Sequence, residues 1–152
     1  MRLPGFVSLL VALTPFAFAT PAQAAWELRQ IPGLAVIEQV VEGTRVTFQC
    51  LGRQKDRLQV GFDRGAEDMP ATPAVMLWIE APDGRTARHS MDAFKEGPGL
   101  SATLLTSDIV LDQLRQAAAL EFTIAGTGKR IVRTNAKGTG AFRLAVLEQC
   151  GF

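Results

Sequence analysis

The stretch that decides the fold is RVTFQCLGRQKDRLQVGFD, residues 45–63. Apolar side chains occupy every second position of residues 46–50 and again of residues 58–62. This is the period of a strand with one buried face. The polar run at residues 52–56 between them predicts a hairpin loop. Cys50 shares the apolar face of the first strand, so we expect its sulfur in the interior.

Strands are also predicted on both sides of this hairpin. Residues 74–80 are apolar on both faces, which indicates a central strand. The Pro- and Gly-rich segments between the predicted strands are typical of turns, and we expect loops at residues 65–73 and 92–99. The remaining predicted strands are residues 26–29, 35–41, 86–91, 120–124 and 130–134.

Two segments change to the period of a helix. Ser107 and its neighbours offer an N-cap for a helix over residues 108–118. Residues 141–150 lack Gly and Pro and are rich in Ala and Leu, which predicts a second helix with Phe142, Ala145 and Val146 inward. The fold class is therefore α+β and β-rich: an antiparallel sheet or small sandwich with one internal helix and a C-terminal helix.

The N-terminal residues resemble an export signal. Arg2 precedes an apolar run over residues 6–19, and small residues stand at the positions that a signal peptidase reads before Ala25. The run is too short to span a bilayer, which needs about 20 apolar residues. We therefore expect residues 1–24 to be a cleaved signal peptide and residues 25–152 to be a single β-rich domain, periplasmic or secreted.

The two cysteines allow one intramolecular pairing, Cys50 with Cys150. An exported protein meets an oxidising environment, which favours a structural disulfide. Because Cys150 ends the last predicted helix, this disulfide would fasten that helix to the strand of Cys50.

The order of these features is similar to two families of small exported Gram-negative proteins. The features are Trp26 after the leader, the Cys50 strand at residues 47–50, Leu-x-x-Leu at residues 111–114, and Gly138 followed by a helix ending in Cys150. This order resembles the invasion-associated locus B family and the type VI secretion accessory family TagO (VasI). The resemblance implies a β-rich periplasmic or surface domain with a disulfide-tethered C-terminal helix. It also implies a protein that acts through other envelope proteins and is not an enzyme.

The sequence offers one candidate for a catalytic residue. His89 is the only histidine, and a small hydrolase would have to use it with Ser90 or Asp92. Adjacent residues of a strand point to opposite faces, so His89 and Ser90 should diverge, and we expect a solvated histidine on a polar edge strand. We expect no catalytic residues, no metal site and no cofactor.

Charge and aromatic residues suggest the type of partner. The chain carries 16 Lys and Arg against 15 Asp and Glu, which gives no global attraction to nucleic acid or to an anionic membrane. A local basic hairpin contains Lys129, Arg130, Arg133 and Lys137, and it is interpreted first as a charged sheet edge. Trp78 is either covered by a helix, which we favour, or exposed to a partner.

These four residues, Trp78, Lys129, Arg130 and Arg133, are the candidate partner surface. The sequence thus predicts a non-catalytic envelope protein, of the invasion- or secretion-associated accessory type, that binds another protein. The alternatives are a small-ligand-binding domain and a hydrolase that uses His89.

Overall fold

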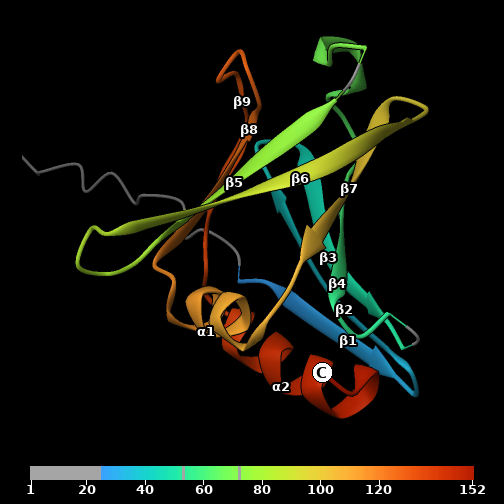
Figure 1. Ribbon diagram of the computed structural model, residues 1–152, viewed down its shortest axis with the longest axis vertical. Helices are drawn as coiled ribbons and strands as arrows, with labels where there is room; N and C mark the ends of the chain where they lie inside the picture. Colours follow the sequence, from blue (N-terminus) through green and yellow to red (C-terminus); the bar gives the residue numbers. More distant parts are fainter. Residues whose placement is uncertain (1–24, 53, 72) are drawn as a thin grey trace, which may run out of the picture.

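The computed structural model describes residues 25–52, 54–71 and 73–152 (Figure 1). The predicted leader and the loop residues Arg53 and Thr72 lie outside this description. The helices are the short 3-10 helix Ala66–Asp68 (η1) and the α-helices Asp108–Gln116 (α1) and Thr139–Cys150 (α2). The strands are Glu27–Ile31 (β1), Leu34–Val41 (β2), Thr44–Leu51 (β3), Arg57–Phe62 (β4), Ala74–Glu80 (β5), Thr86–Glu96 (β6), Gly99–Leu105 (β7), Ala119–Ile124 (β8) and Arg130–Asn135 (β9).

Within the described residues all strands belong to one antiparallel sheet. The nine strands have the order β1-β2-β3-β4-β7-β6-β5-β8-β9, so the architecture is a single sheet and not a sandwich. The sheet curls, and both α-helices lie together at one end of its concave side (Figure 1). The first half is a simple meander, and the second half joins it through the β4–β7 pair.

The curl brings the two ends of the sheet close to each other. Thr134 of β9 donates a hydrogen bond from Oγ1 to Gln39 Oε1 of β2, and both side chains are buried. Trp26, just before β1, donates its backbone N–H to Lys137 O at 2.9 Å and its indole Nε1–H to Asn135 O at 2.8 Å. These bonds join segments about a hundred residues apart in the chain, and they enclose the core.

Four aromatic side chains occupy the centre of this core. The Phe48 ring of β3 lies 5.5 Å from Trp26, 5.9 Å from Phe122 of β8 and 6.2 Å from Phe142 of α2, measured between ring centroids. Tilted and edge-to-face contacts of this kind stabilise a core beyond the apolar area that they bury. The apolar face predicted for residues 46–50 is therefore the centre of the molecule.

Helix α1 begins as predicted and ends earlier than predicted. Ser107 is its N-cap, and its Oγ accepts a hydrogen bond from the N–H of Val110 at 3.4 Å. The last helical residue is Gln116, because the N–H of Ala118 bonds to Glu80 O at the end of β5 instead of continuing the helix. The prediction of a helix to residue 118 was therefore two residues too long.

Helix α2 is fixed at both ends. At its start Thr139 donates from Oγ1 to the backbone oxygen of Leu114 in α1 at 2.6 Å. Gly138, which precedes it, has φ of 108°, and a Cβ there would lie 2.8 Å from Trp26 O, so this position requires glycine. At its end Cys150 is joined by a disulfide to Cys50 of β3, with 6.3 Å between the Cα atoms. The predicted tether between the C-terminal helix and this strand is confirmed.

The prediction of a loop at residues 92–99 was wrong. Strand β6 continues to Glu96, and after a short turn the chain forms β7 over Gly99–Leu105, a strand that was not predicted. Gly97-Pro98 is a turn signal between these strands. The exposed Phe94, Lys95 and Glu96 obscured the strand pattern before the turn.

Candidate functional site

Trp78 lies in a row of four side chains that crosses the outer face of the sheet. Its cross-strand neighbours are Arg88 of β6 on one side and Glu121 of β8 on the other. Glu121 in turn lies opposite Arg133 of β9. Residues that lie opposite each other in an antiparallel sheet share a face. Trp78 and Arg133 of the predicted partner surface are therefore on the same face, separated by a carboxylate.

The expectation that a helix covers Trp78 was wrong. Leu77, its neighbour in β5, points to the opposite face and lies opposite His89 of β6. The imidazole of His89 contacts Gln113 of α1, so α1 lies on the face away from Trp78. Trp78 is half-buried among neighbouring strands, and its indole Nε1–H bonds to Thr123 Oγ1 at 3.1 Å.

The three predicted cations are each held by a carboxylate. The hydrogen bonds with Glu80 and then with Glu121 raise the pKa of Arg133 above its usual value, because they favour its charged form. This hairpin is an ion-paired strand edge, and Lys129 lies at its turn beside Asp68 of η1. The pairs are Lys129 with Asp68 (2.6 Å), Arg130 with Glu121 (3.4 Å), and Arg133 with Glu80 (2.5 Å) and Glu121 (3.2 Å).

Next to Trp78, strand β6 has one unpaired edge. It pairs with β5 from Thr86 to Asp92, but with β7 only from Asp92 to Glu96. From Asp92 toward the Thr86 end of β6 the two strands diverge, and β7 leads into α1 (Figure 1). Within the described chain, residues 86–91 therefore have a strand partner on one side only.

The hydrogen bonds at both ends of the β5–β6 pair show which backbone groups face this open edge. Ala81 N bonds to Arg85 O at 2.8 Å, and Ala93 N bonds to Pro73 O at 3.1 Å. Odd-numbered residues of β6 thus turn their N–H and C=O toward β5, and even-numbered residues turn theirs away. The backbone groups that face the gap between β6 and β7 therefore belong to Thr86, Arg88 and Ser90, which are all exposed.

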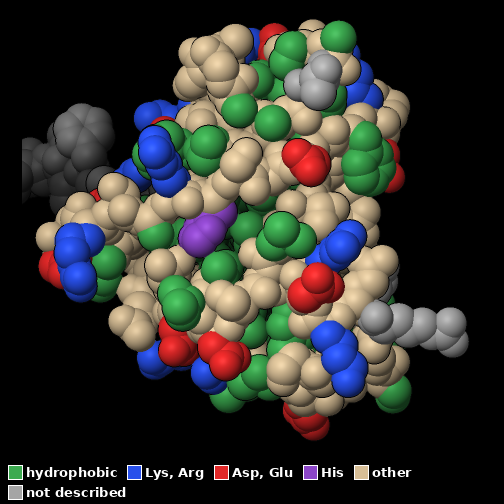
Figure 2. Space-filling view, viewed as in Figure 1, with side chains coloured by type: hydrophobic (Ala, Val, Ile, Leu, Met, Phe, Trp, Pro, Cys, Tyr) green, Lys and Arg blue, Asp and Glu red, His purple; other side chains and the backbone are tan. Residues whose placement is uncertain are grey.

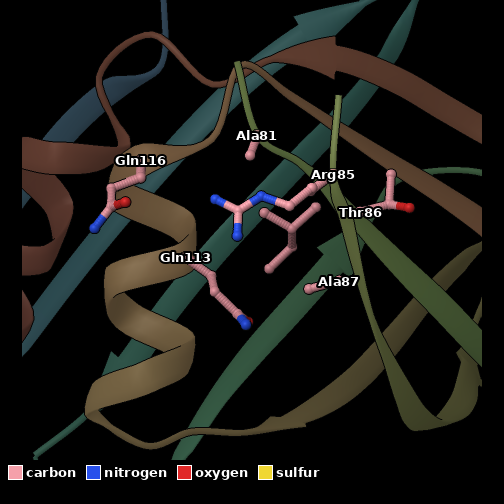
Figure 3. Close-up of a pocket in the computed structure, with 7 residues that line it drawn as sticks. Ala81, Arg85, Thr86, Ala87, Gln113 and Gln116 are labelled. Carbon is pink, nitrogen blue, oxygen red and sulfur yellow. The ribbon is translucent and has the colours of Figure 1, made fainter. Parts of the chain in front are cut away.

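A cavity of about 310 Å³ lies between the inner face of this strand pair and α1 (Figure 3). Figure 2 shows the purple side chain of His89 in a hollow of this face, with hydrophobic side chains around it. The cavity is open to solvent and has both apolar and polar walls. Its lining includes Ile79, Ala81 and Ala87 on the sheet side, Gln113 and Gln116 on α1, and Arg85.

Arg85 extends across the cavity toward α1 (Figure 3). Its backbone and its side chain are both hydrogen-bonded to Asp83 in the β5–β6 turn. Asp83 accepts the backbone N–H of Arg85 at 3.1 Å and its Nε–H at 2.6 Å. The backbone hydrogen bond and then the guanidinium hold the pKa of Asp83 below its usual value.

The expectation of a solvated histidine was wrong, because His89 lies on the inner face of β6 and contacts α1. Its side chain is half-buried and its Nε2 lies 2.8 Å from Gln113 Oε1. Ser90 and Asp92 lie on the opposite face of β6, since they differ from His89 by one and three positions. The three residues of the hydrolase hypothesis are therefore not brought together, in agreement with the predicted divergence of His89 and Ser90.

The open edge itself was not predicted. The prediction of a strand over residues 86–91 is confirmed, but the local sequence is the same whether a strand has one neighbour or two. Residue Gln113 was also missed, because its position 24 residues from His89 has meaning only in the folded chain.

Comparison of the chain with protein-family models, with curated proteins and with solved structures found no match. Neither α-helix of the described residues has the length and hydropathy needed to cross a membrane. Across residues 25–52, 54–71 and 73–152, no group of three or more His, Cys, Asp or Glu side chains is placed to hold a metal ion.

Proposed function

We propose that this chain is an exported, non-catalytic protein of the bacterial envelope that acts by binding another protein. One observation carries this proposal: strand β6 lies within the sheet order and still leaves residues 86–91 unpaired on one edge. Natural proteins usually cover or block such edges, because unpaired N–H and C=O groups pair readily with another chain. An exposed edge beside an open cavity therefore supports a binding role.

Export is supported by the sequence of residues 1–24 and by the disulfide. A bond between Cys50 and Cys150 persists in oxidising compartments, such as the periplasm or the exterior of the cell. The resemblance to the invasion-associated locus B and TagO (VasI) families supports the same compartment and an accessory role in invasion or secretion.

Site-specific cross-linking in the source cells tests this function. A photoreactive amino acid replaces the exposed Ser90 in the full-length precursor, and a matched control replaces Val40, which is 54% exposed on the distant strand β2. We expect a defined adduct with one envelope protein from position 90 and none from position 40. The adduct should contain a chain whose N-terminus is Ala25. Equal labelling from both positions, or none from position 90, would contradict a binding role for this edge.

The cavity favours a second candidate, a small-ligand-binding domain. Its volume of about 310 Å³ is near the lower end of the ligand-pocket range, roughly 300–1,000 Å³. Native mass spectrometry of protein purified from the envelope distinguishes the two. A retained small molecule that is lost in an Ala87→Leu variant, combined with no adduct from position 90, would favour this alternative over protein binding.

A further inference from the structure

The backbone groups and side chains at the open edge of β6 indicate the kind of segment that it binds. We propose that it takes an extended segment of the partner protein as an added strand, and that this segment places an acidic side chain beside Arg88. This inference rests on the protein-binding function proposed above and adds the chemical class of the partner segment.

The backbone of the edge sets the mode of binding. Thr86, Arg88 and Ser90 each present one N–H and one C=O to the gap. Residues 86–91 are long enough to pair with about 20 Å of extended chain. Addition of a strand to an exposed sheet edge is a known mode of peptide recognition, in which the main chain supplies affinity and alternate side chains supply specificity.

Charge on the outer face sets the first side-chain preference. Arg88 is exposed, and no carboxylate in the described part of the chain forms an ion pair with it. Arg130 and Arg133, which lie farther along the same face, are both paired with acids. An added strand would place one residue opposite Arg88 on this face. Opposite charges at such cross-strand positions are favourable and like charges are not, so an acidic residue is expected there.

The cavity on the inner face sets the second preference. The residues before and after the acid would point to the inner face of the sheet, opposite Ala87 and His89, because successive side chains of a strand alternate between faces. Ala87 lines the cavity and forms its apolar side together with Ile79 and Ala81, whereas His89 is not part of the lining. We therefore expect an apolar side chain next to the acid, at the position beside Ala87.

A second copy of this chain fits the edge less well. Antiparallel pairing of two β6 edges about Arg88 would place two guanidinium groups opposite each other, which is unfavourable. The charge of the edge thus favours a segment of different sequence.

A phage library of random linear peptides, about nine residues long, tests this inference on the intact mature protein. We expect enriched peptides with an apolar residue next to an acid. Their affinity should fall at least about fivefold for Arg88→Glu, since an attractive pair becomes a repulsive one. A matched control, Arg45→Glu, changes an exposed arginine on the distant strand β3 and should bind normally. Enrichment without an acidic position, or equal binding by both variants, would overturn the proposal.

N-methylated versions of the best peptide test strand addition directly. Methylation of the residues whose N–H groups would face β6 should abolish binding, whereas methylation of the residues between them should not. Equal effects at all positions would show that no ladder forms.

The two proposals fail in different ways. A protein adduct from position 90 together with a peptide library that yields no consensus would overturn strand addition and leave the binding function. A dimer in sedimentation experiments that Thr86→Pro abolishes would assign the edge to a second copy and overturn the acidic-segment proposal.

Discussion

The imidazole Nε2 of His89 on β6 lies 2.8 Å from the amide Oε1 of Gln113 on α1, across the gap that the divergence of β6 and β7 opens. With the amide in this orientation its oxygen accepts, so the contact is a hydrogen bond in the tautomer that carries the proton on Nε2. This contact joins the strand with the open edge to the helix that forms the opposite wall of the cavity.

Replacement of Gln113 by Ala tests this contact. The loss of one partly buried hydrogen bond should lower the free energy of unfolding by about 0.5–1.5 kcal/mol, measured by urea denaturation. Gln116→Ala is the matched control, since Gln116 lines the same cavity from the same helix. We expect an Nε2–H signal of His89 in nitrogen NMR that broadens in the Gln113 variant. A wild-type ring protonated on Nδ1 alone would contradict the assignment.

Hydrogen exchange should alternate along the open edge. Because the N–H groups of Ala87 and His89 face β5 and those of Thr86, Arg88 and Ser90 face the gap, the first two should exchange more slowly. Amide exchange followed by NMR at neutral pH measures this directly. Uniform protection of all five amides would mean that the edge is covered in solution.

The disulfide should contribute strongly to stability. It closes a loop with a sequence separation of 100 residues, for which the chain-entropy model gives about 4.7 kcal/mol as an upper value. We expect the Cys50→Ala/Cys150→Ala variant, and the reduced wild type, to unfold at clearly lower urea concentration than the oxidised protein. Two alkylatable thiols in non-reduced exported protein would contradict the pairing.

Phe48 should be among the most sensitive core positions. It is fully buried and contacts three other aromatic rings, so Phe48→Ala should cost about 3–5 kcal/mol. The control is Phe94→Ala, because Phe94 is 48% exposed and surface changes usually stay within about 0.5 kcal/mol. Similar losses for both variants, measured by chemical denaturation, would contradict this description of the core.

Asp83 should titrate below the ordinary value of 3.8 for its carboxyl group. A pKa lowered by folding means that the charged form is favoured in the native state. Its contribution is present above the unfolded pKa and is lost as pH falls through the folded one. Carbon NMR of the carboxyl group measures the midpoint. Arg85→Ala should raise this midpoint only in part, because the backbone N–H of residue 85 remains. A wild-type midpoint at or above 3.8 would contradict this arrangement.

Much of the fold could be predicted from local patterns. The alternation around Phe48 and Cys50 identified strands β3 and β4, and the helical period after Ser107 identified α1 to within two residues of its end. The continuation of β6 to Glu96 was missed, because the exposed side chains before Gly97 do not show the alternation of a half-buried strand.

The candidate site was only partly predictable. Trp78 and His89 were noted as unusual residues, but the sequence favoured a helix over Trp78, with exposure to a partner as the alternative, and it predicted His89 in solvent. The structure places them on opposite faces of the same strand pair, with Arg88 beside Trp78 and Gln113 beside His89. Which face of a strand a helix covers depends on chain connections that no local pattern records.

By itself the sequence determined the positions of most strands and both α-helices, and the residues available for one disulfide, because period, capping and cysteine count are local properties. Only the tertiary structure decided that β6 leaves β7 after Asp92 and that a cavity forms between β6 and α1. The reason is physical: a strand edge is open or closed according to which distant segment pairs with it, and that pairing depends on the packing of the whole chain.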